Sequence, residues 1–208
     1  MLTLTDETLL HGVSQLAERD PDLARILATW GPPPLWAREP GFPTLIHIIL
    51  EQQVSLASAK AAFNRLLALA TPLTPEAFLA LDDSTLKMVG FSRQKMLYGR
   101  HLAQAIVSGE LDLAALTEAD DETARTTLLK RKGIGLWTAD IYLLMALRRP
   151  DIWPVGDLGL VVAMQEVKQL ATRPRAEEME ALAHSWRPWR AVAARLLWHH
   201  YLSKRGLV

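Results

Sequence analysis

The chain has 208 residues, half of them hydrophobic (50%), which is enough for one or two domains with a buried core. It contains no cysteine, which excludes disulfides and any iron–sulfur cluster held by cysteine. The 23 basic and 23 acidic side chains cancel, so attraction to nucleic acid must come from a local patch or from backbone N–H groups. No apolar run approaches membrane-spanning length and no signal peptide is visible, so we expect a soluble, cytoplasmic protein with no membrane contact.

Helical spacing and capping residues dominate the pattern along the chain. A first helix is predicted over residues 4–19 with Thr5 as its cap, and Pro21 opens a second that ends near Trp30. A proline-rich crossing over residues 31–43 follows. Helices are then expected at 43–69 (divided somewhere between 53 and 58), 75–81, 84–89 and 93–107, the last with Lys95 and Arg100 exposed to solvent, before a short link at 112–118. No segment shows the alternation of a strand, so the predicted fold is all-α.

Residues 123–148 carry the most informative local pattern, which is helix, Gly133-Ile134-Gly135, helix. It predicts a helix-hairpin-helix, whose second helix would present unpaired backbone N–H groups to a phosphate. The carbonyls that precede the turn could hold a hard monovalent cation; they belong to Leu129, Arg131 and Gly133. On these residues alone, an ordinary pair of antiparallel helices with a glycine cap is an equal alternative. The run Lys130-Arg131-Lys132 fits either phosphate contacts or a solvated face.

Downstream, Asp157 directly precedes an apolar run that begins at Leu158. Aspartate is among the commonest residues at the N-cap of a helix, so Asp157 read by itself is a cap. A catalytic carboxylate at the same position is compatible with that assignment.

The motifs occur together in a recognisable order, which spans about residues 40 to 202. They are Ile-Leu-Glu-Gln-Gln-Val-Ser at 49–55, the segment 86–102, Gly-Ile-Gly-Leu-Trp-Thr-Ala at 133–139, Val-Gly-Asp-Leu-Gly-Leu at 155–160, and Trp-Arg-Pro-Trp-Arg at 186–190 leading to Leu197-Trp198. In this respect the chain resembles the helix-hairpin-helix DNA glycosylase superfamily, in particular its 3-methyladenine DNA glycosylase II branch. The resemblance implies a monomeric, two-lobed helical bundle with the active site in the cleft between the lobes. Residues 1–39 would pack with a C-terminal lobe of residues 151–208, and residues 40–150 would form the central lobe, with the hairpin at about 123–148.

The resemblance also assigns expected roles to site residues. Asp157 would stabilise the positive charge that develops on the deoxyribose, or act on the attacking water; the sequence does not decide between these roles. Trp137 and Trp198 would line the base pocket, since indole faces attract a cationic alkylated purine. Ile141 is a further pocket candidate. Many relatives carry tyrosine at that position, so a different range of lesions stays open.

For DNA binding, the resemblance implies that the hairpin grips the backbone through Gly133, Gly135 and Thr138, and Lys132 beside the turn is a further candidate for a phosphate contact. Gln53 would fill the gap left by a flipped nucleotide, although Gln and Ser at such a junction usually belong to a solvated helix end. Bifunctional relatives carry lysine where this chain has Trp137, so no amine is available there for a Schiff base and no strand cleavage is expected.

The predicted function is therefore that of a base-excision-repair DNA glycosylase. It would hydrolyse the N-glycosidic bond of alkylated bases, such as 3-methyladenine and 7-methylguanine, flipped out of double-stranded DNA. It would need no cofactor beyond the possible cation, and would act in the cytoplasm, associated with the nucleoid when bound to DNA. The alternatives are a non-catalytic helix-hairpin-helix DNA-binding protein, a glycosylase for other damaged bases, a bifunctional glycosylase–lyase, and a helical protein unrelated to DNA.

Overall fold

The computed structural model describes residues 2–207 of the chain and contains only helices in that range. This confirms the all-α prediction. The chain divides into two compact units, one of Met1–Ala37 with Leu143–Val208 and one of Arg38–Tyr142. Within the described range, no helix is long and apolar enough to cross a membrane.

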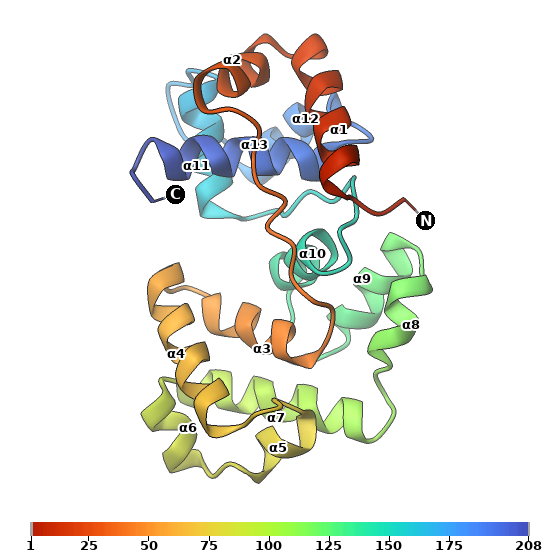
Figure 1. Ribbon diagram of the computed structural model, residues 1–208, viewed down its shortest axis with the longest axis vertical. Helices are drawn as coiled ribbons and strands as arrows, with labels where there is room; N and C mark the ends of the chain where they lie inside the picture. The colour runs from red at the N-terminus through yellow and green to blue at the C-terminus, as the bar shows by residue number, and fades with distance from the viewer. Residues whose placement is uncertain (1, 208) are drawn as a thin grey trace. The chain divides into compact units, whose positions relative to one another are not determined.

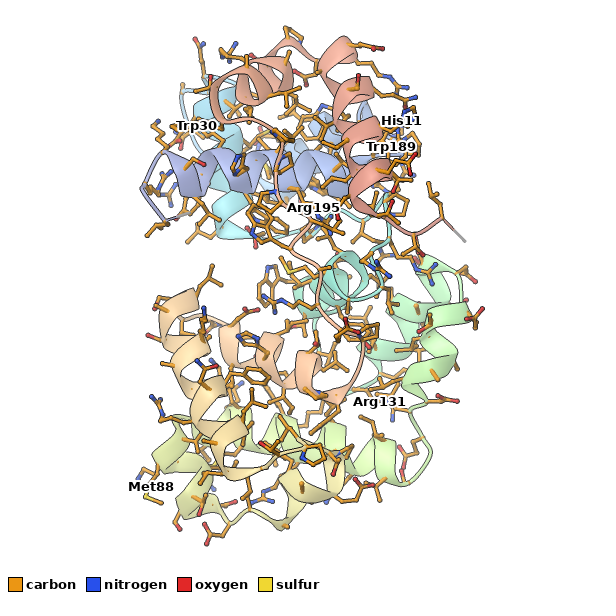
Figure 2. The ribbon with its side chains drawn as sticks, in the orientation of Figure 1. His11, Trp30, Met88, Arg131, Trp189 and Arg195 are labelled. Carbon is orange, nitrogen blue, oxygen red and sulfur yellow. The ribbon has the colours of Figure 1, made fainter. Side chains whose placement is uncertain are left out.

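The first unit is built around its last helix. Its helices are α1 (Asp6–Arg19), α2 (Pro21–Trp30), α11 (Leu158–Val167), α12 (Ala176–His184) and α13 (Arg190–Ser203). Helix α13 packs against the other four (Figure 1), and every residue of it from 191 to 199 is buried. Helix α1 approaches it closely at Gly12, where a Cβ would lie 2.9 Å from the Trp189 ring. Beside that contact, the His11 ring meets the edge of Trp189 (Figure 2), with centroids 5.8 Å apart.

Polar side chains fix the orientation of α13 within this unit. Arg195 is 0% exposed and donates to the carbonyls of Leu35, Ala191 and Leu144 at 2.8, 3.0 and 2.8 Å (Figure 2). Burial lowers the pKa of Arg195 to about 9. Three carbonyl acceptors satisfy the buried guanidinium, so Arg195 ties α13 to the crossing segment and to the end of α10.

The second unit contains the hairpin. Its helices are α3 (Phe42–Glu51), α4 (Leu56–Leu69), α5 (Pro75–Ala80), α6 (Asp83–Val89), α7 (Arg93–Val107), α8 (Leu113–Glu118), α9 (Asp121–Leu129) and α10 (Leu136–Met145), the last turn of which continues past Tyr142 into the first unit. Helix α3 packs on α4 and on α7 (Figure 1). The two hairpin helices are joined by an ion pair, because Nε of Arg125 on α9 lies 2.7 Å from Oδ1 of Asp140 on α10. Asp140 is 2% exposed, so this pair lies in the interior.

The structure corrects two expectations drawn from the sequence and adds one helix. Residues 112–118 are not merely a link, because they contain α8, and α12 was not predicted. Lys95 and Arg100 are not simply exposed. Lys95 donates to the carbonyl of Leu50 at 2.7 Å, and Arg100 donates to two backbone carbonyls and to a carboxylate. Their acceptors are distant in the sequence, so helical periodicity could not reveal them.

Candidate active site

The hairpin turn is closed against the protein on one side and open on the other. Gly133 has φ +88, and a Cβ there would lie 2.1 Å from Cγ of Tyr98, so only glycine fits. Ile134 is 4% exposed and anchors the turn in the core. A Cβ on Gly135 would meet nothing within 4 Å. The backbone at Gly135 is therefore accessible to a ligand from outside.

The beginning of α10 lies directly behind this open face. The first N–H groups of a helix have no partner within the helix, and the helix dipole gives them partial positive charge. Lys132, an exposed side chain, precedes the turn. This combination can bind a phosphate through backbone groups without reading a base.

The three carbonyls predicted to hold a cation belong to this turn. The oxygen of Arg131 accepts from the N–H of Ile134 at 3.1 Å, and that of Gly133 accepts from the Gln52 amide at 2.9 Å. A carbonyl oxygen has two lone pairs, so each retains acceptor capacity, and the third oxygen is that of Leu129. The donor set is thus chemically compatible with a hard monovalent cation. Within residues 2–207, no group of three or more His, Asp or Glu side chains is arranged to hold a metal ion.

Asp157 lies in the first unit, at the N-cap of α11. Its Oδ1 accepts from the N–H of Leu160 at 2.9 Å and from Nε1 of Trp198 at 3.0 Å. Gly159 leaves room for this arrangement, since a Cβ there would lie 3.2 Å from Oδ1 and 3.5 Å from the Trp198 ring. The carboxylate is therefore held in one orientation by donors from two helices, and the cap predicted from the sequence is confirmed.

Trp198 has a contact that sequence reasoning missed. The side chain is 8% exposed and directs its N–H to Asp157, which lies 41 residues earlier in the chain. The family resemblance suggested a role only for its ring face, as a wall for a base. No local signal pairs the two residues, and only their joint presence in the resembled motifs pointed to a shared site.

The other pocket candidates lie on α10. Trp137, in its first turn, is partly exposed, whereas Ile141, one turn further along, is 2% exposed. The adjacent Tyr142 is 0% exposed, and its hydroxyl accepts from the N–H of Gly41 at 3.0 Å. Trp137 is thus the residue of this group that presents side-chain surface.

The junction between α3 and α4 contains the proposed DNA probe. Gln53 is exposed and has φ 57, a left-handed conformation that is uncommon outside glycine. The side-chain amide of its neighbour Gln52 donates to the carbonyl of Gly133 and to Oγ1 of Thr138. Thr138 is 2% exposed, so its hydroxyl faces the protein and any contribution to DNA binding would pass through its backbone or through Gln52.

Comparison with known protein families identifies a superfamily. Residues 46–188 match the model of the HhH-GPD superfamily base excision DNA repair proteins. The chain belongs to this superfamily. The resemblance inferred from the sequence motifs is confirmed, and the hairpin of the second unit and the Asp157 cap of the first both fall inside the matched region.

Individual HhH-GPD relatives carry related names. The chain is 28% identical over 195 residues to DNA-3-methyladenine glycosylase 1 of Schizosaccharomyces pombe, covering 89% of this chain and 83% of that protein. It is 29% identical over 126 residues to DNA-3-methyladenine glycosylase 2 of Escherichia coli, covering 61% and 42%. The match spans less than half the length of this and of two Bacillus subtilis relatives.

Solved structures of the superfamily share the fold. A 3-methyladenine DNA glycosylase of S. pombe in complex with abasic DNA superposes with a TM-score of 0.84 at 25% identity, covering 90% of this chain and 95% of that one. A DNA-3-methyladenine glycosidase of Bacillus halodurans gives a TM-score of 0.77 at 27% identity, covering 99% and 95%.

Proposed function

We propose that this HhH-GPD protein is a monofunctional DNA glycosylase that removes alkylated bases, among them 3-methyladenine and 7-methylguanine, from double-stranded DNA. It would hydrolyse the N-glycosidic bond of a base flipped out of the helix and leave an intact strand with an abasic site. It would act as a monomer in the cytoplasm, and its metal-independent chemistry would require no cofactor.

The observation that carries the proposal is the fixed carboxylate of Asp157. Cleavage of an N-glycosidic bond develops positive charge on the sugar, and a carboxylate in a fixed position stabilises that charge without reorganising. The Leu160 N–H and the Trp198 indole both bind Oδ1, so the orientation of the group is set before substrate arrives. Alkylation already makes the base a good leaving group, which reduces the need for a strong general acid.

The residue at position 137 supports hydrolysis over lyase chemistry. Tryptophan has no amine, so it cannot form the Schiff base through which a lysine at this position would cleave the strand. Its partly exposed indole instead offers a π-face to an N-alkylated purine, which carries positive ring charge. That attraction contributes about 0.5–2 kcal/mol per contact, and an unmodified neutral base would not receive it. The proposal also includes Trp198 and Ile141 as further walls of the base pocket.

DNA binding is assigned to the hairpin and to the α3–α4 junction. The open face at Gly135, with Lys132 nearby, would hold a phosphate, and Gln53 would occupy the space of the flipped nucleotide. A monovalent cation on the carbonyls of Leu129, Arg131 and Gly133 would add positive charge at the turn.

The decisive experiment measures base release from duplex DNA treated with a simple methylating agent. The wild type is compared with Asp157→Asn, which keeps an N-cap side chain of the same shape and so preserves α11. We expect the wild type to release 3-methyladenine and 7-methylguanine. Asp157→Asn should lose at least about two orders of magnitude in rate, the size typical of removing one preorganised electrostatic group. The product strand should stay intact until it is cleaved by alkali.

Each alternative predicts a different result. Equal release by both proteins would contradict the role of Asp157. A covalent adduct trapped by borohydride would indicate lyase chemistry. DNA binding without release would leave either a non-catalytic protein or a glycosylase for other lesions, which a panel of oxidised and deaminated bases would distinguish.

A further inference from the structure

The α3–α4 junction has little backbone support of its own. Its turn hydrogen bonds are long, from Gln52 N–H to the Ile49 carbonyl at 3.3 Å and from Val54 N–H to the Glu51 carbonyl at 3.5 Å. It also contains the left-handed Gln53 and exposes Val54 at 47%. A segment with weak turn bonds and an unfavourable φ keeps one conformation only where its surroundings impose it.

Side chains impose that conformation from three sides. Lys95 on α7 donates to the Leu50 carbonyl at 2.7 Å. Arg38 pairs with both oxygens of Glu51, at 2.7 and 3.0 Å, and the Glu51 side chain is only 6% exposed. A bidentate, largely buried pair of this kind defines a single geometry. These two anchors hold the end of α3, immediately before the junction.

The third anchor connects the junction to the hairpin. The Nε2 of Gln52 donates to the Gly133 carbonyl at 2.9 Å and to Oγ1 of Thr138 at 3.0 Å, which are 81 and 86 residues away in the chain. A primary amide nitrogen carries two hydrogens, so one atom satisfies both acceptors. One acceptor lies in the turn and the other in the first helical turn of α10. The residue next to Gln53 is thereby fixed to both parts of the phosphate-binding element.

We propose that Gln52 is a positioning residue that holds the proposed DNA probe, Gln53, in fixed register with the hairpin. The inference rests on the proposed function. When the hairpin holds a phosphate, the two hydrogen bonds of Gln52 place the probe at a defined base-pair position along the duplex. Binding at a gap in the base stack then requires no ordering of the junction, and recognition of a flipped nucleotide is coupled to the backbone grip.

The test uses Gln52→Met, which keeps the length of the side chain and removes both N–H donors. Dissociation constants are measured for duplexes with and without a tetrahydrofuran abasic-site analogue, whose gap the probe would fill. We expect affinity for the abasic duplex to fall by about tenfold, as for loss of one or two net hydrogen bonds, with affinity for intact duplex nearly unchanged. A 2-aminopurine placed opposite the gap should show a smaller fluorescence change on binding.

Two further variants separate positioning from a general loss of structure. Gln104→Met makes the same chemical change on the exposed face of α7 in the same unit and should leave the ratio of the two affinities unchanged. Thr138→Val removes one of the two acceptors of Gln52, so its effect should be smaller in the Gln52→Met background than in the wild type. A general loss of structure would instead lower the affinity for both duplexes together and lower the melting temperature.

The outcomes distinguish the two proposals. If the wild type binds abasic and intact duplexes equally well, the proposed function itself is in error. If the wild type discriminates and Gln52→Met discriminates as strongly, the function stands and the positioning role of Gln52 is refuted.

Discussion

At the scale of single residues, the N–H of Trp198 bears on the orientation of the proposed catalytic group, Asp157. Its indole donates to Asp157, and the Leu160 N–H supplies a second donor to the same oxygen. The Leu160 N–H still binds Oδ1 when the indole is removed. In a Trp198→Phe variant the carboxylate should therefore keep its position but become more mobile. The loss in rate should therefore be smaller than for Asp157→Asn.

We predict that Trp198→Phe lowers the single-turnover rate of base release by about tenfold, which is the kinetic equivalent of one hydrogen bond of ordinary net strength. Trp30→Phe is the matched control, since Trp30 also donates an indole N–H in this unit, to Nδ1 of His200 at 3.3 Å and not to Asp157. The control should retain the wild-type rate. An unchanged rate in Trp198→Phe would mean that the Trp198 N–H is not needed to fix the carboxylate.

The same scale shows what sequence reasoning could not supply. The cap at Asp157 was predicted because the signal is local, a carboxylate directly before an apolar helix. The hydrogen bonds of Gln52, Lys95 and Trp198 join residues between 41 and 86 apart in the chain, and spacing along one helix contains no information about them. Gln52 was visible only as part of a polar patch.

At the scale of elements, the two glycines of the hairpin have separable roles. At Gly133 a Cβ would overlap the Tyr98 ring and force a left-handed residue, so Gly133→Ala should destabilise the protein by at least about 1–3 kcal/mol. At Gly135 a Cβ has open space, so Gly135→Ala should leave the free energy of unfolding nearly unchanged.

The glycine variants should also be distinguished by their affinity for DNA. If the backbone at Gly135 approaches a phosphate, the added methyl keeps the ligand away, and Gly135→Ala should bind duplex DNA about tenfold or more weakly. Thermal unfolding and fluorescence anisotropy on the same preparations would measure both quantities. Wild-type DNA affinity in Gly135→Ala would place the phosphate elsewhere.

The predicted helix bounds are most accurate where a capping residue or a proline marks the start of the helix. The spans of α2 and α7 matched those predicted because a proline or a serine cap marks where each begins. The short α8 and the α12 segment were missed. Six residues show too little periodicity to identify a helix by themselves; α5, of the same length, opens with a proline, whereas α8 does not, and the N-cap of α12 is Arg175, which is not a usual capping residue.

At the scale of the whole molecule, net charge bears on how DNA is held. The chain has no net charge, and many of its cations are already paired, among them Arg38, Arg125, Lys168, Arg190 and Arg205. The paired side chains are less available to displace counterions. Backbone N–H groups at the hairpin would supply much of the grip, and they contribute little to counterion release.

The salt dependence of DNA binding tests this directly. With about two or three phosphates neutralised by side chains, a plot of log affinity against log salt should have a slope of about −2 to −3. Lys132→Gln should reduce that slope by about one unit, whereas Lys87→Gln, at an exposed site on α6, should not change it. A slope of about −6 or steeper would require many more lysine or arginine contacts, and the DNA would then be held mainly by a basic surface, not by the hairpin backbone.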